Sequence, residues 1–497
     1  MQRLGSWLAV ALAATAACSN PGPAGIGQPC ADPSDCAASA QCFAGVCTPR
    51  CRSHVECGDG YRCTDDGVCE MVESSVGDAC VRELDCGVHQ TCRPDDADVD
   101  GDGRLAATCQ PVAPGRVPGA PCAADADCQT GVCAIGTCAD LCAGDSDCGP
   151  DRVCADVPRL LPGAAPLFAT CLPARARFSA PVPLAENGGR VRVAVPSHAA
   201  SVAVVVRAEN PQVTVGVTRA VAPDGTVLVD WPNPGRIRYA PARHESTLLI
   251  PNAPDIDVAV GAYEFTVTAL RAPGELAGET PRVDVVYALG PDTGAATIDL
   301  HMVFLDLAGH PCAAAFDGGT LSAATASVSP SFADFVDAID AILAPAGVSV
   351  GAVTYRDLRG RPDLDALDTR ELGALLSTST EPGGATVFFV RSIDPSGILA
   401  LAGAIPGAPG LVGRPTAGVA IGAEALCYRS WTDLARSAAH AIGHYAGLFA
   451  NVAPDGTADP IADSPTDASN LMYFSEFGGV GVSPGQAEVL RRSPVTR

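Results

Sequence analysis

The run His440-Ala441-Ile442-Gly443-His444-Tyr445-Ala446-Gly447-Leu448-Phe449-Ala450 carries the most specific pattern in this chain. Two histidines four residues apart share one face of a helix, where they can hold a metal ion together, and the following glycine is suited to end that helix. An H-x-x-x-H pair alone is weak evidence, because helix histidines more often satisfy their ring nitrogens within the protein. The interpretation of the pair therefore depends on the sequence around it.

Residues 296–497 mix strand-like and helix-like patterns. Apolar spacing predicts a helix from about residue 331, with a buried face of Phe332, Phe335, Val336, Ile339, Ile342 and Leu343. A second helix is predicted from about Ser430 to about Leu448. Strands are predicted at residues 297–304, 348–350, 385–390 and 418–421. This order predicts an α/β domain.

The histidine run resembles the H-E-x-x-H-x-x-G-x-x-H motif of the metzincin zinc metallopeptidases, particularly the pappalysin-like branch. Three later landmarks keep the order of that branch. They are Asp459–Pro465, which resembles its Asp-Thr-Pro segment, Asn470-Leu471-Met472, which resembles its Met-turn at Met472, and Ser483–Gln486, which resembles the start of its closing helix. The resemblance implies a metzincin-like metallopeptidase domain over residues 296–497.

The same resemblance places alanine at two essential positions. The general-base Glu falls on Ala441 and the third zinc ligand on Ala450, while Phe474 stands where some relatives carry Tyr. A methyl group accepts no proton, and loss of the base alone typically lowers the rate about 10²–10⁴-fold. We therefore expect a degenerate domain without catalytic residues, in which His440 and His444 are residual zinc ligands and zinc is a disfavoured cofactor.

Three functions follow for this domain. The favoured one is binding or scaffolding at the cell surface, with an extended protein or peptide ligand added as a strand near residues 418–423. The second is an active zinc-dependent endopeptidase with an atypical ligand set, completed by Asp455, Asp459 or Asp463. The third is a purely structural envelope protein. Cys312 and Cys427, the last two cysteines, are expected to pair and join the end of the first strand to the entry of the histidine helix.

Residues 178–295 contain no cysteine and show the alternation of half-buried strands. The strand-like runs are 190–193, 201–204, 212–217, 226–229, 262–267 and 282–287. Turn sequences such as Asn187-Gly188-Gly189 and Pro223-Asp224-Gly225 separate them at the spacing of a β-sandwich. The stretch 261–267 resembles the last strands of sandwich modules that flank secreted bacterial peptidases. A structural or adhesive spacer is the favoured interpretation.

Residues 27–172 form a cysteine-rich repeat. Three units open alike at Cys30, Cys80 and Cys122, and in each the next cysteine follows as C-x5-C and is preceded by Asp. Large apolar side chains are scarce between the cysteines, so disulfides rather than a hydrophobic core are expected to hold the fold. C-x2-C knuckles are absent, which disfavours zinc. The modules loosely resemble cysteine-rich repeats of bacterial surface lipoproteins, and the pairing stays open.

The second unit contains Asp98-Val99-Asp100-Gly101-Asp102-Gly103, the first half of an EF-hand-type loop. Asp98, Asp100 and Asp102 are candidate ligands for a weak calcium site. The twelfth position is Cys109 instead of the bidentate Glu. A solvated acidic loop is the alternative interpretation.

The first residues predict export. Residues 1–17 form a signal peptide with one positive charge and a short apolar run, and residues 18–26 form a Pro/Gly-rich tether. Thr15-Ala16-Ala17-Cys18 resembles the lipobox of bacterial lipoproteins, which implies lipidation of Cys18, a membrane anchor and, with Ser19 next, export to the outer membrane. An ordinary signal peptide that leaves a spare thiol is the alternative. Removing Cys18 leaves an even number of cysteines.

Composition fits a multidomain exported protein: disulfide-rich small modules, then a β-sandwich, then an α/β metzincin-like domain. The 497 residues suffice for roughly three domains. The formal net charge of -24 argues against nucleic-acid partners, because a phosphate backbone would be repelled. Most of the 23 cysteines lie between Cys30 and Cys171, which points to an oxidising compartment.

Overall fold

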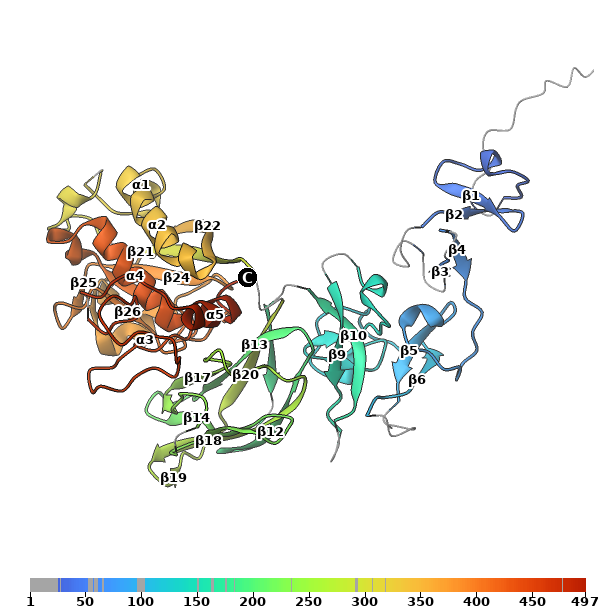
Figure 1. Cartoon of the computed structure of the whole chain (residues 1–497), viewed down its shortest axis with the longest axis horizontal. Helices are drawn as coiled ribbons and strands as arrows, with labels where there is room; N and C mark the ends of the chain where they lie inside the picture. Colours follow the sequence, from blue (N-terminus) through green and yellow to red (C-terminus); the bar gives the residue numbers. More distant parts are fainter. Residues whose placement is uncertain are drawn as a thin grey trace, which may run out of the picture.

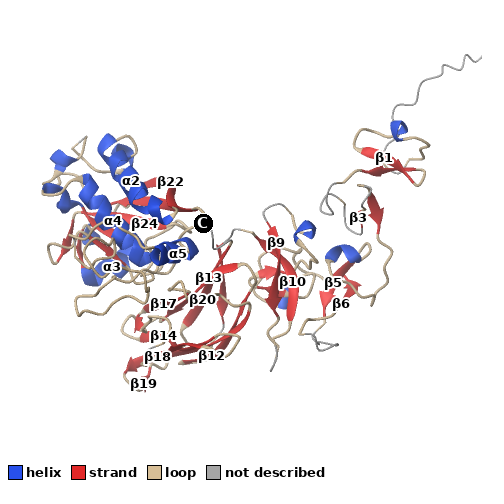
Figure 2. Ribbon diagram, in the orientation of Figure 1, coloured by secondary structure: helices blue, strands red, loops and turns tan. Residues whose placement is uncertain are grey.

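Figure 1 shows a computed structural model of the chain. It describes residues 26, 28–51, 57, 61–64, 67–95, 103–149, 152–161, 165–174, 177–182, 184–233, 235–290, 294–305, 307–317, 319–475 and 477–497. The predicted signal peptide, Cys18 and the three candidate calcium ligands lie outside these residues. Small disulfide-bonded modules come first, a mostly β region follows, and helices surround a sheet at the end (Figure 2). The multidomain, disulfide-rich prediction is thus confirmed at this coarse level.

The cysteine-rich region consists of five modules, each with two disulfides. In every module the first cysteine pairs with the third and the second with the fourth: Cys30–Cys42 and Cys36–Cys47, Cys51–Cys63 and Cys57–Cys69, Cys80–Cys92 and Cys86–Cys109, Cys122–Cys133 and Cys128–Cys138, Cys142–Cys154 and Cys148–Cys171. The disulfide prediction is confirmed. The structural unit is shorter than the sequence repeat: the two cysteines of each C-x3-C pair belong to different modules, so the junction between modules lies between them.

Each module contains one antiparallel strand pair. The pairs are β1 (Ala40–Phe43) with β2 (Val46–Pro49), β3 (Tyr61–Cys63) with β4 (Cys69–Met71), β5 (Gln90–Pro94) with β6 (Ala107–Pro111), β7 (Cys133–Ala134) with β8 (Thr137–Cys138), and β9 (Arg152–Pro158) with β10 (Leu167–Pro173). The aspartate before the second cysteine has a structural role. One carboxylate oxygen of Asp35, Asp85, Asp127 and Asp147 accepts the two backbone N–H groups three and four residues earlier. These bonds close a tight turn that sets the first cysteine beside the hairpin.

The expectation that no hydrophobic core forms among the cysteines is wrong for the later modules. Ile135, Leu141, Phe168 and Leu172 are buried in one continuous cluster with the interior of the β-sandwich. The apolar residues are few, but they lie on the surfaces where the modules meet the next domain. A core therefore forms between units too small to enclose one alone.

Two antiparallel sheets form the β-sandwich. One has the order β11 (Arg177–Val182), β20 (Arg282–Leu289), β13 (Ala199–Arg207), β17 (Glu245–Ile250). The other has the order β12 (Gly188–Val195), β18 (Gly261–Ala272), β14 (Thr214–Val221), β15 (Val227–Asp230), with β16 (Ala242–Arg243) on β14 and β19 (Glu275–Leu276) on β18. All six predicted strand runs lie within strands or overlap them. The run Glu245–Ile250 was not predicted.

The sandwich is docked to the last domain and is not a free spacer. On the outer face of its first sheet, Leu249 and Val286 pack against Ala408 and Ala417 of the C-terminal region. Arg414 pairs with Asp284 and lies 3.8 Å from the Glu245 carboxylate, which also accepts from Thr416 Oγ1 at 2.5 Å. Burial raises the pKa of Glu245. The strands β13, β17 and β20 of the first sheet are therefore covered on both faces.

The C-terminal region contains a five-stranded sheet in the order β22 (Val348–Asp357), β21 (Ala296–Phe304), β24 (Ala385–Val390), β27 (Val419–Gly422), β26 (Ala400–Ala402). The first four strands are parallel and β26 is antiparallel. β23 (Ala366–Asp368) and β25 (Ser392–Asp394) form a small separate pair. The predicted α/β order is present, and the strand expected at 348–350 continues to residue 357.

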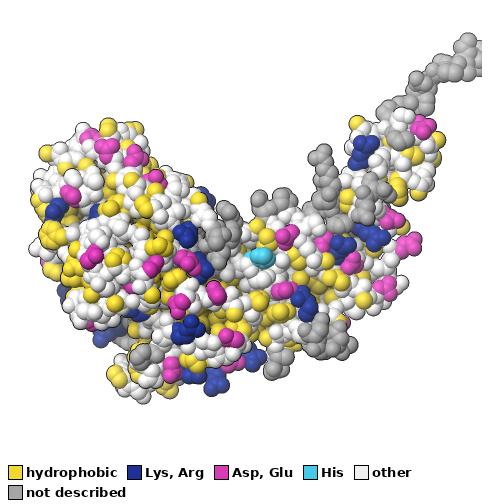
Figure 3. Space-filling view, viewed as in Figure 1, with side chains coloured by type: hydrophobic (Ala, Val, Ile, Leu, Met, Phe, Trp, Pro, Cys, Tyr) yellow, Lys and Arg dark blue, Asp and Glu magenta, His cyan; other side chains and the backbone are white. Residues whose placement is uncertain are grey.

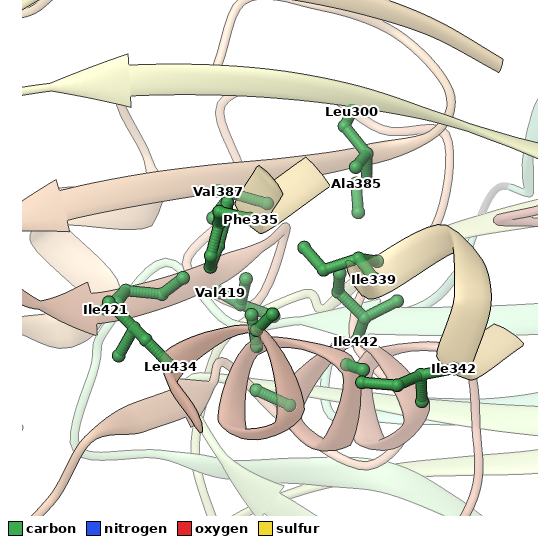
Figure 4. Packing of buried hydrophobic residues seen from close by; sticks show 14 of the residues in the cluster. Leu300, Phe335, Ile339, Ile342, Ala385, Val387, Val419, Ile421, Leu434 and Ile442 are labelled. Carbon is green, nitrogen blue, oxygen red and sulfur yellow. The ribbon is translucent and has the colours of Figure 1, made fainter. Parts of the chain in front are cut away.

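Five α-helices complete the described part of this region: α1 (Ala323–Ala326), α2 (Pro330–Leu343), α3 (Leu372–Leu376), α4 (Trp431–Tyr445) and α5 (Pro484–Arg492). Phe335 and Ile339 of α2 and Leu434 and Ile442 of α4 enclose one face of the sheet, around Val387 and Val419 (Figure 4). The predicted start of the first helix, at about residue 331, thus agrees with the observed start of α2 at Pro330. The histidine helix ends three residues earlier than expected, because Gly447 adopts a φ of 114° just beyond its C-cap.

A disulfide joins Cys312 to Cys427, with their Cα atoms 4.8 Å apart. It connects the loop after β21 to the turn that precedes α4. Every cysteine after Cys18 is therefore paired. None of the helices in the described part of the chain is both long and apolar enough to cross a membrane. On the face shown in Figure 3, acidic and arginine side chains are interspersed.

Candidate functional site

The helix that carries the histidine pair has a well-defined start. Ser430 caps α4 by accepting from Asp433 N, and Asp433 returns a bond to Ser430 N. His440 and His444 lie one turn apart on the same face, with ring centroids 4.5 Å apart and nearly perpendicular planes. The geometry thus brings together the two residues that the sequence pattern singled out.

Backbone carbonyls fix the tautomer of each imidazole. His440 Nδ1 lies 2.7 Å from Leu471 O, and His444 Nδ1 lies 2.7 Å from Leu448 O. A carbonyl oxygen only accepts, so each Nδ1 carries the proton and each Nε2 presents a lone pair. Burial lowers the pKa of His440 to about 4 and that of His444 to about 3. Both rings are neutral near pH 7, in the form that binds metals.

Met472 lies directly beneath the histidine helix. Its side chain is fully buried, and a Cβ added at Gly443 would come within 2.7 Å of its sulfur. Asn470 Oδ1 accepts from Met472 N at 2.8 Å and fixes this turn. The glycine between the two histidines therefore allows the methionine turn to approach the helix closely.

Arg436 holds the same turn from the helix side. It is 8% exposed, one helical turn before His440, and donates to the carbonyl oxygens of Leu471, Tyr473, Ser475 and Gly479 at 2.9–3.5 Å. Burial lowers its pKa. Sequence reasoning missed this residue, although its spacing to His440 at i, i+4 places a third polar side chain on the histidine face.

Hydrogen bonds connect the three later landmarks. Asp463 accepts from Ser483 Oγ and Gly485 N, both at 2.9 Å, at the start of α5. Gln486 Nε2 donates to Asn470 Oδ1 at 3.2 Å and lies 3.4 Å from Asp459 Oδ2. The segment around residue 460, the methionine turn and the closing helix thus form one polar network beside α4.

The aspartates that were candidates for a third zinc ligand accept hydrogen bonds from nearby protein groups. Asp459 and Asp463 bind the residues just described, and Asp455 accepts from Thr457 N at 2.9 Å. Among the described residues, the only groups of three or more metal-ligand atoms within 4.8 Å of one another are disulfide-bonded cysteines. The residues around the two imidazoles therefore do not fit a three-ligand catalytic zinc site.

The alanines occupy the positions that the resemblance assigns to the base and the third ligand. Ala441 is 1% exposed and faces the hydrophobic core with Ile442. Ala450 is half-buried, and Asn451 next to it donates from N to Met472 O at 3.1 Å. Phe474 is exposed beside Tyr473. A side chain longer than methyl at position 450 would thus start beside the methionine turn.

Strand addition at residues 418–423 is wrong, because β27 is an interior strand. It pairs with β24 on one side and with β26 on the other, so its backbone groups have partners. The last strand in the sheet order is β26, which contacts α4. Within the described residues, this short strand is the sheet edge nearest the histidine helix.

No protein-family model fits this chain, and no curated protein is significantly similar to it.

Proposed function

We propose that this chain is an exported surface protein whose C-terminal domain is a metzincin-like metallopeptidase domain that binds extended peptides without cleaving them. The support for the family resemblance is spatial. The four sequence landmarks, spread over residues 440–486, lie together and are joined by hydrogen bonds through Leu471, Asn470 and Gln486.

One observation carries the non-catalytic part of the proposal. The helix position after His440 holds a buried methyl group, and no carboxylate of the described residues joins the imidazole pair. Hydrolysis by this class of peptidase needs a base beside the metal-bound water and three protein ligands. The histidine face keeps the orientation for metal binding but lacks the groups for turnover.

Peptide binding would use the edge strand β26. An extended peptide can add to an exposed edge through main-chain hydrogen bonds, while pockets for alternate side chains give specificity. The loop that leaves β26 is anchored at both ends of its course: Gly407 N donates to Tyr445 O at 3.1 Å on α4, and Arg414 binds the sandwich. This anchoring keeps the edge in place for a ligand.

The test uses the purified full chain. We expect metal analysis to find less than one zinc per chain and casein to remain intact. A fluorescent peptide library is expected to yield ligands whose binding weakens when Ala402→Pro removes a β26 N–H that points away from β27. Stoichiometric zinc with chelator-sensitive casein cleavage would reject the non-catalytic proposal. Unchanged peptide affinity in the proline variant would reject the edge-strand mode.

A zinc peptidase with an atypical ligand set is the second candidate, and the fixed tautomers favour it. Both Nε2 atoms point away from the carbonyls that hold the rings, as in metal-binding histidines. The third candidate is a purely structural envelope protein. If the full chain binds neither peptides nor zinc, this structural function is the one that remains.

Pairing of every cysteine after Cys18 indicates an oxidising, exported location. Anchoring through lipidated Cys18 in the outer membrane is a proposal that rests on the sequence. The chain contains no lysine, so its N-terminal amine is its one amine group. We expect the membrane-extracted protein to resist amine-reactive dye and to incorporate labelled palmitate, both lost in Cys18→Ala. Palmitate uptake that survives this substitution would reject the anchor.

A further inference from the structure

A cavity of about 540 Å³ lies where the fourth and fifth cysteine modules meet the β-sandwich. The β7–β8 turn, the β9–β10 pair and the strands β12 and β20 form its walls, and apolar side chains dominate them, including Ile135, Val157, Phe168, Val193 and Tyr287. This size falls within the range of small-molecule pockets, about 300–1,000 Å³, which occur preferentially between domains. None of these residues belongs to the histidine site.

The wall at the module tip holds a residue in an unfavourable backbone conformation. Ile135 has a φ of 52°, in the left-handed region that costs a β-branched residue energy, and its side chain is buried. The equivalent two-residue turn of the first module has Ala44 at a φ of 48°, and that alanine is exposed. The turn itself thus needs no large side chain. Ile135 therefore adds a large apolar side chain to the wall at this junction.

The charged groups of the lining are mostly positive. Arg159 and Arg192 line the cavity together with a single carboxylate, Asp125. Arg159 lies 3.2 Å from Asp125, and Arg192 lies 3.1 Å from Glu264 on the neighbouring strand. In a chain with a formal net charge of -24, two guanidinium groups at an apolar cavity favour an anionic head group. Leu160, 40% exposed, adds an apolar side chain to this lining.

We propose that this cavity binds a free medium-chain fatty acid. Its carboxylate would accept hydrogen bonds from Arg159 and Arg192, and its aliphatic chain would lie over the accessible apolar lining at Leu160, Val182 and Ala194. Val157 and Phe168 are 1% and 4% exposed and lie in the cluster that joins the modules to the sandwich, so they form a fixed floor beneath this lining.

The probe is dodecanoate below its micellar concentration, titrated calorimetrically into the full chain. We expect one saturable site per chain. Arg192→Gln should weaken dodecanoate about tenfold, since hydrogen bonds to charged groups are among the stronger ones. The Arg192 side chain is 38% exposed and not part of the core, so this variant should fold normally. Arg219→Gln, which removes an exposed ion pair with Asp230 on a different strand pair, is the matched control and should leave affinity unchanged.

Two further arms complete the test. Ala194→Phe places a ring at the half-buried lining of β12 and should weaken binding of dodecanoate at least tenfold while the thermal unfolding curve is retained. Dodecylamine, which has the same chain and the opposite charge, should not bind. Absence of a saturable site in the unmodified chain, equal binding of dodecylamine, or undiminished binding in both cavity variants would overturn the proposal.

Discussion

The variant Ala441→Glu/Ala450→His is expected to bind one zinc ion per chain, at least roughly a hundredfold more tightly than the unmodified protein. This estimate is conservative, because even the outer hydrogen-bond partners of metal ligands are worth about 10–100-fold in affinity. The two existing imidazoles already present Nε2 lone pairs, and residue 450 starts beside the turn that holds His440. A third imidazole there would complete a three-histidine set. Zinc is measured by competition with a chromophoric chelator and by metal analysis.

The single variants separate the two roles. Ala450→His alone should gain most of the zinc affinity, since it supplies the ligand. Ala441→Glu alone should mainly lower stability, because it buries a carboxylate at a position that is 1% exposed. Adding His440→Ala to the double variant is the control and should abolish the gain. Failure of the double variant to bind zinc, with its fold intact, would show that the metzincin alignment is wrong.

Arg436→Met is expected to destabilise the C-terminal domain by roughly 3 kcal/mol. The substitution keeps the length of the side chain but removes the donors to four backbone carbonyls, and each buried acceptor left unpaired costs about 1–3 kcal/mol before water or relaxation offsets it. For a domain of this size each kcal/mol lowers the melting temperature by about 2–4 °C. The expected decrease is therefore about 6–12 °C, measured by differential scanning calorimetry on the full chain.

Arg370→Met is the matched control for this measurement. Arg370 is 88% exposed and pairs with Asp368 on the surface, so its loss should change stability by less than about 0.5 kcal/mol. Equal melting temperatures for the two variants would mean that the carbonyl contacts of Arg436 contribute little. In that case the methionine turn would have to be held chiefly by Asn470 and by packing of Met472.

Local patterns in the sequence predicted many strands of the sandwich and of the C-terminal sheet, and the two longest helices, α2 and α4. The half-buried strands of the sandwich and the amphipathic helix α2 each leave a periodic signal, because one of their faces meets water. Glu245–Ile250 was missed for the converse reason. All six of its residues are buried, since β17 lies between the sandwich interior and the C-terminal domain, so no alternation marks it. Its burial on both faces depends on a domain that begins about fifty residues later in the chain.

The candidate site, like the fold, could be predicted from the sequence only in part. The sequence by itself determined which residues can carry chemistry: two histidines on one helical face, with alanine at the neighbouring positions. It also indicated that the cysteines would be paired, because their even number after Cys18 and their repeated spacing can be read directly from the sequence. Only the tertiary structure decided that β26 and not β27 is the sheet edge, that Asp459 and Asp463 are occupied, and that Arg436 supports the methionine turn. These outcomes depend on contacts between distant segments, and a sequence pattern reports the period of a segment but not what will cover its faces.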